Sequence, residues 1–528
     1  MEANAQDHSS APTYEDEKAS YQEYLSTAGT GRHGRQEELR TTPLFSLAVK
    51  HTIDGNLGHG VTARRRSSST TGSDDFRDAS DEPSDIEVQA APECPNQPHD
   101  ESESIDDPQP PVLPQYALIG HHVGEDATIG KNEPILLNVN APSSTFICGS
   151  QGSGKSYTLA SMLENVLLPT TKLGKVTEPV AGVVFHYDVD STNSIAEAAY
   201  LCSRGIKVNV FVSQSNATAL TKAYKAIDKD GNITVQPLLL RSSDLSIERM
   251  HKLMAVANKE GPMPLYMEVV QRILREMAIS DTFSYANFKA KLDAEKLTKD
   301  QTGPMSLRLG LLESFMAVQD RGELPSRQHT NHPKQSLFDL SPGTLTIIDL
   351  SDTFIDSSTV CILFDVCLGL IKEQRPPSGL VISLDEAHKY MNKTAAADTF
   401  TERLLTTIRE QRHNAARVIM ATQEPTISER LLDLCSISIV HRFTSPAWFL
   451  SIKDHLSGAS KLVTSSEEQH AMFERIVDLN VGECLVFSPS SFVRMEDGKV
   501  KKLGAVAMKM KSRKRLGEDG GMSVLASG

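Results

Sequence analysis

Residues 149–156 read Gly-Ser-Gln-Gly-Ser-Gly-Lys-Ser and match the pattern GxxxxGK[ST] with three glycines. The segment follows an apolar run at residues 144–148 and opens a run with helical periodicity at residues 157–167, which is the strand–loop–helix setting that the pattern requires. Glycines let the backbone wrap closely around a phosphate, and the N-terminus of the following helix adds its positive end. The segment therefore predicts a phosphate-binding loop.

The residue types in this loop predict the ligand as ATP with Mg²⁺. We expect Lys155 to bridge the β- and γ-phosphates and Ser156 to ligate the metal. The remaining residues of the loop would surround the phosphates with backbone N–H groups. The predicted nucleotide-binding residues are Gly149, Ser150, Gln151, Gly152, Ser153, Gly154, Lys155, Ser156 and Tyr157.

A second apolar run, at residues 380–384, ends in the carboxylates Asp385 and Glu386. At the carboxyl end of a parallel strand, both side chains would face the crevice in which a nucleotide binds. We expect Asp385 to hold Mg²⁺ through a water molecule and Glu386 to orient and deprotonate the attacking water. Alone, the pair would also fit an acidic turn after a buried strand. Together with the phosphate loop, it predicts an ATP hydrolase.

Two further candidates follow the acidic pair. A strand pattern at residues 418–421 leads to Gln423, whose amide would sense the γ-phosphate from a position beside the acidic strand. An amide that only caps its strand gives the same pattern, so both interpretations stay open. Three arginines, each of which also fits an ordinary surface position, are candidates for an arginine finger: Arg409, Arg412 and Arg417.

The pattern after Tyr116 predicts the fold class. Short β-branched or apolar runs alternate with helical patterns, which indicates an α/β fold with a mostly parallel sheet and helices on both faces. Residues at about 244–320 have helical periodicity and predict a helical insertion between two halves of the sheet. The expected strands lie at residues 145–148, 183–187, 208–212, 344–350, 380–384, 418–421 and 437–441.

The first 112 residues are rich in Ser, Thr, Pro, Gly, Asp and Glu, so we expect a disordered acidic tail that cannot offset its chain entropy by burial. Residues 1–115 hold 22 of the 68 acidic and 9 of the 54 basic side chains, which leaves 46 and 45 for the remainder. The acidity therefore belongs to the tail. The folded domain, expected at residues 113–522, is nearly neutral, and residues 523–528 should form a flexible C-terminus.

Cysteine usage and hydropathy indicate the compartment. The seven cysteines form no CxxC pair, and we interpret them as small core residues in a reducing environment. No apolar stretch approaches the ~20 residues of a membrane helix. The N-terminus has the pattern of neither a secretory signal nor a mitochondrial presequence. We expect an intracellular soluble protein of the nucleus or the cytoplasm, without a membrane partner.

From about residue 116 to residue 521 the chain resembles the HerA–FtsK superfamily of P-loop ATPases, and HerA-type motors most closely. The matching segments come in the family's order: the phosphate loop; residues 184–190 as the second strand with its acidic end; residues 341–351 as the "PG…IDLS" strand; residues 384–388 as the Walker B strand; residues 409–412 and 421–425 as the "E-x-R…SQRP" segment; residues 435–442 as the next strand; and residues 513–521 as the C-terminal "RKT-x-HGG".

The resemblance implies a RecA-like (ASCE) P-loop NTPase fold, ATP and Mg²⁺, and a homo-oligomeric ring, commonly a hexamer, that translocates double-stranded DNA. By position, Arg412 would be a finger that reaches the ATP of a neighbouring subunit, and Gln423 the sensor. A nuclease or an adaptor would be a further partner. Two departures stand out: the family's N-terminal β-barrel is not visible, and its Gln-Arg-Pro reads Gln423-Glu424-Pro425.

Two classes of function remain. The first is a ring-forming, DNA-stimulated ATPase in DNA processing that binds double-stranded DNA without sequence preference. The alternative is a nucleotide-gated interaction or scaffold protein with slow hydrolysis and no translocation. The intact Glu386 favours turnover, whereas the missing barrel and the neutral domain favour the alternative. Basic candidates for DNA contacts are Lys509, Lys511, Arg513, Lys514 and Arg515.

Overall fold

The computed structural model describes residues 37–54, 112–189, 194–254, 265–279, 283–317, 320–321, 336–425, 427–456, 465–518 and 520. The predictions for the rest of the acidic tail and for residues 523–528 lie outside these ranges. Among the described residues, no helix combines the length and the apolar composition that crossing a membrane requires.

The central feature is a parallel sheet, which confirms the predicted α/β class. Eight neighbouring strands of the described chain run parallel, in the order β12-β4-β11-β10-β6-β9-β7-β8. All seven predicted strands are among them, and the edge strand β8 is the one that the pattern missed. Their bounds are β4 (Ser144–Cys148), β6 (Ala181–His186), β7 (Val208–Val212), β8 (Ile233–Pro237), β9 (Leu345–Asp349), β10 (Leu380–Leu384), β11 (Ala416–Thr422) and β12 (Ile437–His441).

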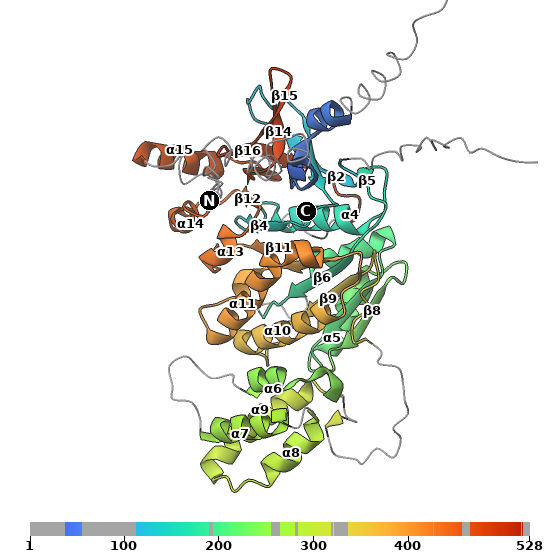
Figure 1. Ribbon diagram of the computed structural model, residues 1–528, viewed down its shortest axis with the longest axis vertical. Coiled ribbons are helices and arrows are strands. Elements are labelled where there is room, and N and C mark those ends of the chain that lie inside the picture. The colour runs from blue at the N-terminus through green and yellow to red at the C-terminus, as the bar shows by residue number, and fades with distance from the viewer. Residues whose placement is uncertain are drawn as a thin grey trace, which may run out of the picture.

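Both faces of this sheet are buried under helices, as predicted (Figure 1). In β6, Val183 and Phe185 belong to the core under α10 (Ser357–Glu373) and α11 (Ala395–Arg409), whereas Val184 belongs to the core under α4 (Lys155–Leu167). Successive side chains of a strand point to opposite faces, so a strand buried on both faces reads as a continuous apolar run. The other helices are η1 (Glu197–Arg204), α5 (Ala217–Ile227), η2 (Ser242–Asp244), η4 (Ala387–Lys389), α12 (Gln411–Asn414), α13 (Glu429–Asp433), α14 (Pro446–Ile452) and α15 (Ser466–Val477).

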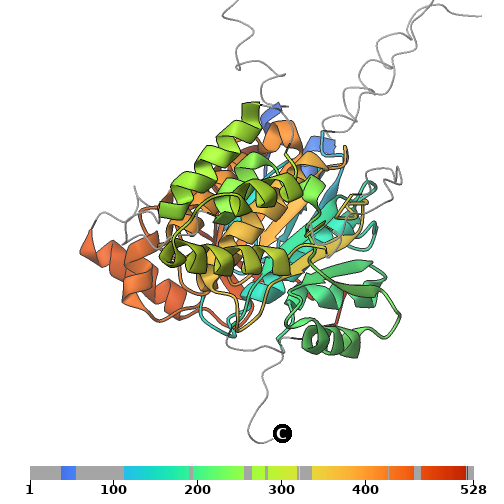
Figure 2. The same cartoon turned by 90° about the horizontal axis from the view of Figure 1, so that it is seen from below.

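The predicted helical insertion lies between β8 and β9. Its described helices are α6 (Ile247–Met254), α7 (Leu265–Ile279), α8 (Tyr285–Asp293) and α9 (Lys299–Ser314). They form a layer at one end of the long axis of the molecule, and Figure 2 looks directly onto them. The expectation of a helical segment at about residues 244–320 is therefore confirmed for the residues that the structure describes.

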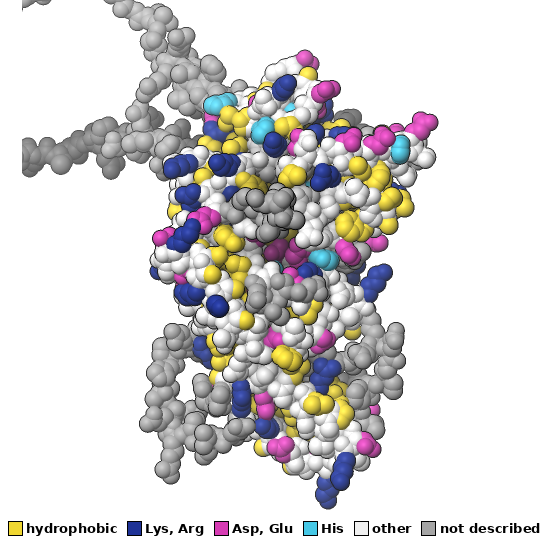
Figure 3. Space-filling view, turned by 180° about the vertical axis from the view of Figure 1, so that it is seen from behind, with side chains coloured by type: hydrophobic (Ala, Val, Ile, Leu, Met, Phe, Trp, Pro, Cys, Tyr) yellow, Lys and Arg dark blue, Asp and Glu magenta, His cyan; other side chains and the backbone are white. Residues whose placement is uncertain are grey.

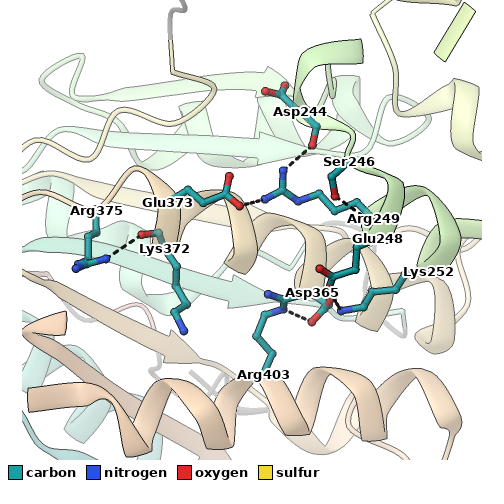
Figure 4. A network of polar contacts seen from close by, with 10 residues as sticks. All are labelled: Asp244, Ser246, Glu248, Arg249, Lys252, Asp365, Lys372, Glu373, Arg375 and Arg403. Atoms are coloured by element: carbon teal, nitrogen blue, oxygen red, sulfur yellow. Dashed lines mark hydrogen bonds and ion pairs between the residues drawn. The ribbon is translucent and has the colours of Figure 1, made fainter. Parts of the chain in front are cut away.

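Ionic contacts around one buried carboxylate fasten this insertion to the sheet layer (Figure 4). Asp365 of α10 has a side chain that is 1% exposed, and its Oδ2 accepts a hydrogen bond from Lys252 Nζ of α6 at 3.0 Å. Arg403 of α11 donates to both oxygens of Asp365. Arg249 of α6 pairs with Glu373 at the end of α10. Asp365 thus interrupts an apolar helix because it anchors a second layer.

The sheet continues beyond β12 as a mostly antiparallel extension built from both ends of the chain, with β1 and β14 as a parallel pair. The order of the remaining strands is β15-β14-β1-β3-β2-β16-β13, with β5 paired to β2. Their bounds are β1 (Leu44–Ser46), β2 (Tyr116–His122), β3 (Pro134–Asn138), β5 (Gly174–Lys175), β13 (Glu483–Phe487), β14 (Phe492–Glu496), β15 (Lys499–Lys502) and β16 (Met508–Ser512). In Figure 1 this extension lies at the end of the molecule opposite the insertion.

One part of the segment that we predicted to be disordered is folded. Residues 37–54 contain β1, which pairs antiparallel with β3 and parallel with β14, and Leu44, Phe45 and Val49 are fully buried. The Leu44 N–H donates to Ser491 Oγ, 447 residues further along the chain. The prediction was wrong here because the apolar run is short and its burial depends on strands from the far end of the sequence.

Candidate nucleotide-binding site

Three adjacent parallel strands place the predicted site residues together. β11 lies between β4 and β10, with Thr422 opposite Cys148 and Met420 opposite Leu384. The phosphate loop follows β4, Gln423 follows β11, and the acidic pair follows β10. Because parallel strands end at the same edge of a sheet, the three segments meet at the carboxyl edge, where ligands of open α/β sheets bind.

The loop needs its glycines for backbone conformation. Gly149, Gly152 and Gly154 have φ values of 153°, 72° and 109°, in the region that other residues rarely adopt. Gly149 is also confined, because a Cβ there would lie 2.7 Å from Cβ of His441. Gly154 immediately precedes α4, which begins at Lys155. The backbone N–H groups of the loop and of the first helical turn thus lie together at the helix N-terminus.

Lys155 is a buried cation at the base of this loop. Its side chain contacts the carbonyl oxygen of Ser150 at 3.2 Å, and the residue is 4% exposed. Burial lowers the pKa of Lys155, while the charges of Glu386 and Asp385 oppose that shift. A buried ammonium group gains most from an anion that replaces its lost hydration. The position therefore fits a bound phosphate.

The two carboxylates have different surroundings. Asp385 is buried, with Oδ2 3.3 Å from His186 Nδ1, and its Oδ1 has no hydrogen-bond partner among the described residues. Glu386 has a φ of 47°, which is strained backbone of the kind that gathers at functional sites. Its Oε1 accepts a hydrogen bond from Gln423 Nε2 at 3.2 Å, and its Oε2 lies 3.4 Å from His388 Nδ1. Gln423 thus lies beside the acidic strand and contacts the carboxylate.

His186, at the end of β6, is a site residue that the sequence analysis missed. Burial opposes its protonation, but the charges of Asp349 and Asp385 raise the pKa of His186 to about 9. The ring thus lies against buried carboxylates, whose charge favours its protonated form. Tyr224 donates a hydrogen bond of 2.6 Å to Asp349 Oδ2. The sequence carried a signal for this pair, because His186 and Asp349 are polar residues that each end an apolar run. The sheet then places them opposite each other in β6 and β9.

These groups fit ATP and Mg²⁺. Ser156 lies half-buried in the first turn of α4, the position from which a hydroxyl can reach a metal bound to the phosphates. The unpartnered Oδ1 of Asp385 offers a hard oxygen to an aquated Mg²⁺. The glycine-lined loop and the buried Lys155 would accommodate the phosphates. Asp190, the acidic end of the segment at residues 184–190, lies outside the described residues.

The candidate arginine fingers differ in their positions. Arg417 is wrong as a finger, because it is 6% exposed and its guanidinium donates to the carbonyl oxygens of Val139 and Asn140 at 2.5 and 3.2 Å. Burial lowers the pKa of Arg417 to about 10. Arg409 and Arg412 are exposed, at the end of α11 and in α12. Arg412 makes no hydrogen bond or ion pair with any residue in the described ranges.

Two of the basic residues expected to contact DNA are buried in the protein. Arg513 pairs with Glu164 at 2.8 Å and Arg515 pairs with Glu197 at 2.5 Å, so the prediction was wrong for both arginines. The backbone N–H of Arg515 also donates to the Tyr157 hydroxyl at 2.7 Å.

The remaining basic candidates are surface residues. Lys509 pairs with Glu483 at 2.9 Å, and Lys511 and Lys514 are exposed. On the face drawn in Figure 3, basic and acidic side chains are interspersed. The surface that this view shows therefore agrees with the nearly neutral composition of the domain.

The fold and the loop together are those of a P-loop NTPase, a class defined by a strand, a glycine-rich phosphate loop and a helix in an α/β sheet. No protein-family model matches the chain. No curated protein matches it either.

Solved structures that the chain is similar to include VirB4 of Thermoanaerobacter pseudethanolicus, with 11% identity, 76% of this chain and 97% of that chain covered, and a TM-score of 0.45. The bacterial conjugative coupling protein TrwB has 12% identity, with 77% of this chain and 96% of that chain covered and a TM-score of 0.36. The genome packaging NTPase B204 of Sulfolobus turreted icosahedral virus 2 has 10% identity, with 69% of this chain and 98% of that chain covered and a TM-score of 0.26. These structures are FtsK/HerA-type P-loop ATPases. At these identities and TM-scores, they assign no activity or partner to this chain.

Proposed function

We propose that this chain binds ATP with Mg²⁺ at residues 149–157 and hydrolyses it. One observation supports this most directly. The buried Lys155, the unpartnered oxygen of Asp385 and the hydrogen-bonded pair of Glu386 and Gln423 converge at the carboxyl edge of three adjacent strands. The ammonium group of Lys155 and the carboxylate of Asp385 are costly to bury without a ligand, and ATP with its metal would satisfy both together.

The roles follow from charge and position. Lys155 would neutralise the β- and γ-phosphates, and Ser156 together with Asp385 would hold the Mg²⁺, Asp385 through a water ligand. The metal, when bound, neutralises negative charge that develops on the phosphate oxygens. Glu386 would orient the attacking water and accept its proton at a carboxylate oxygen.

Gln423 would link the γ-phosphate to the base. Its amide N–H donates to Glu386 Oε1, and a γ-phosphate oxygen would compete for that same donor. Binding of ATP would then free Glu386 to accept a hydrogen bond from the attacking water. With ADP, which has no γ-phosphate, the hydrogen bond between Gln423 and Glu386 would remain. The proposed sensor role thus requires the contact between these two side chains.

Ring assembly and DNA translocation are the finer parts of the proposal. The guanidinium of Arg412 is exposed and has no hydrogen-bond or ion-pair partner among the described residues, which suits a finger that enters the site of a neighbouring subunit. Among the basic candidates for DNA, Lys511 and Lys514 remain exposed. We propose a homo-oligomeric, DNA-stimulated motor, with a nucleotide-gated interaction protein as the alternative class.

The test is steady-state ATPase activity of the full chain with and without double-stranded DNA, over a range of salt concentrations. The full chain is required because residues 37–54 are part of the sheet. Glu386→Gln should bind ATP and lose turnover by about 100-fold or more, the usual contribution of a general base. DNA should raise the wild-type rate, and salt should remove that effect. Turnover that is unchanged in Glu386→Gln overturns the hydrolase proposal.

The finger can be tested separately by mixing two inactive variants. In a mixed ring, an Arg412→Ala subunit supplies an intact Glu386 and a Glu386→Gln subunit supplies an intact Arg412. Activity recovered on mixing supports a finger acting between subunits, and no recovery in assembled rings contradicts it. Turnover that depends on Glu386 but ignores DNA favours the nucleotide-gated interaction protein.

A further inference from the structure

The phosphate loop is backed by a fully buried histidine that has no part in the proposed hydrolysis. His441 is the last residue of β12, which pairs with β4 on the side away from β11. Its Cβ would lie 2.7 Å from a Cβ added at Gly149, and its Cε1 3.6 Å from one added at Gly154. One side chain therefore lies against both ends of the loop.

Hydrogen bonds orient this ring. Nδ1 lies 3.1 Å from the carbonyl oxygen of Glu483, so it must donate there. Nε2 of the neutral ring is then an acceptor, and Thr158 Oγ1 of α4 donates to it at 3.0 Å. The Ser512 hydroxyl, 2.9 Å from Thr158 Oγ1, donates to Thr158 in turn. Burial lowers the pKa of His441 to about 4, in keeping with this neutral form.

Backbone contacts fasten the same side of the loop. The N–H and the hydroxyl of Ser150 each donate to the carbonyl oxygen of Arg442 at 2.9 Å. The N–H of Gly482, in the turn before β13, donates to the carbonyl oxygen of Ser153 at 3.3 Å. The loop is thus held on this side by α4, by the residue after β12 and by the turn before β13.

We propose that His441 is a positioning residue for ATP, which keeps the loop in its phosphate-binding shape before the nucleotide arrives. The proposal rests on the nucleotide binding proposed above and does not depend on hydrolysis. A loop that is already ordered loses less conformational entropy when it binds, so the ring should contribute to affinity rather than to the chemical step. A residue with only a structural role would lower stability and leave affinity unchanged.

His122 offers a matched control. It is also a buried histidine, its Nδ1 lies 2.6 Å from a backbone carbonyl oxygen, that of Gly130, and it lies on β2, which β16 and β13 separate from β12 in the sheet. Full-length wild type, His441→Ala, His441→Gln and His122→Ala would be compared by calorimetric titration with ATP and Mg²⁺, by thermal melting, and by kcat and KM for ATP.

We expect His441→Ala to weaken ATP binding by about tenfold, the scale of ordering a mobile side chain or loop on binding, while kcat at saturating ATP stays within about threefold. His441→Gln, whose amide oxygen can still accept from Thr158, should recover part of the loss. His122→Ala should lower the melting temperature and retain wild-type affinity.

The outcomes separate the two proposals. Wild-type affinity in a folded His441→Ala or His441→Gln overturns the positioning role, and so does an equal loss of affinity in His122→Ala. Failure of the wild type itself to bind ATP would instead refute the proposed function. If His441→Ala does not fold, the affinity of His441→Gln decides, with about threefold weaker binding expected.

Discussion

Removing the guanidinium of Arg513 should cost the protein much of its stability, although the sequence suggested a surface contact for DNA. Arg513 follows β16 and lies across α4, the helix that begins at Lys155. Its side chain is 4% exposed, and that of its partner Glu164 is 0% exposed. Replacement by methionine keeps most of the volume and deletes the charge, so the substitution tests the ionic contact.

The structure sets the size of the effect. Arg513 Nη1 lies 2.8 Å from Glu164 Oε2, while Nη2 donates to the Ser161 carbonyl oxygen at 3.0 Å and to Asn165 Oδ1 at 2.9 Å. Without the arginine, Glu164 keeps only the N–H groups of Leu516 and Gly517 as described partners, at 3.1 and 2.8 Å. A buried carboxylate that loses its countercharge typically costs about 3–5 kcal/mol.

Urea unfolding gives the measurement, as a lowered midpoint at an unchanged slope. Adding Glu164→Gln to Arg513→Met should recover part of the loss, because the orphaned charge is removed as well. The control is Lys229→Ala, since the pair of Lys229 and Glu518 lies in the same region with side chains 70% and 47% exposed. Solvent screens an exposed pair of this kind, so Lys229→Ala should leave the urea midpoint close to that of the wild type.

A loss below about 1 kcal/mol for Arg513→Met would refute the reasoning, since that is the scale of an exposed pair. Additive effects in the double variant would contradict it independently. If Arg513→Met weakened DNA binding at unchanged stability, the residue would be a DNA contact after all.

Three further predictions concern other parts of the fold. Asp365→Asn should leave Lys252 and Arg403 without their buried countercharge, cost about 3 kcal/mol, and speed hydrogen exchange in α6 to α9. A chain that begins at residue 112 lacks β1, whose buried Leu44 and Phe45 each contribute ~1.5–3 kcal/mol, so it should melt at a lower temperature than the full chain. For His441, whose pKa burial lowers from 6.5 to about 4, the unfolded state binds the extra proton between these values. The contribution of the neutral ring to the free energy of unfolding is therefore present above pH 6.5 and is lost towards pH 4, by up to ~3 kcal/mol. Because glutamine does not titrate, the melting temperature of His441→Gln should fall less steeply as the pH is lowered.

The parts of the site that the sequence predicted are those in which chemistry and local pattern coincide. The phosphate loop and the pair of Asp385 and Glu386 each follow an apolar run that forms a central strand. The same local pattern therefore predicted both the strand and the site residues at its end. Gln423 could be placed near them because parallel strands end at one edge. The helical insertion was visible because its periodicity changes from that of strands to that of helices.

The missed parts depend on contacts between distant segments. Residues 37–54 fold because β1 pairs with the strands β3 and β14. The composition of the segment does not indicate which distant strands it pairs with. Arg513 and Arg515 read as a solvated basic run, since charged side chains are rarely buried unless they are paired. Their partners Glu164 and Glu197 lie in helices more than 300 residues earlier, where nothing in the sequence pattern marks them as different from surface acids.

The proposed nucleotide site draws on two parts of the chain that lie far apart in the sequence. The residues that would contact the nucleotide, from Lys155 to the acidic pair, come from local motifs of the parallel sheet. Part of what packs behind them comes from the carboxyl-terminal residues. Ser512 reaches the loop through Thr158 and His441, and Arg513 holds α4 from the other side. A force or a partner acting on residues 508–518 would therefore act first on α4, the helix that follows the proposed phosphate loop. Loss of this segment should weaken ATP binding even though every residue of the phosphate loop is intact.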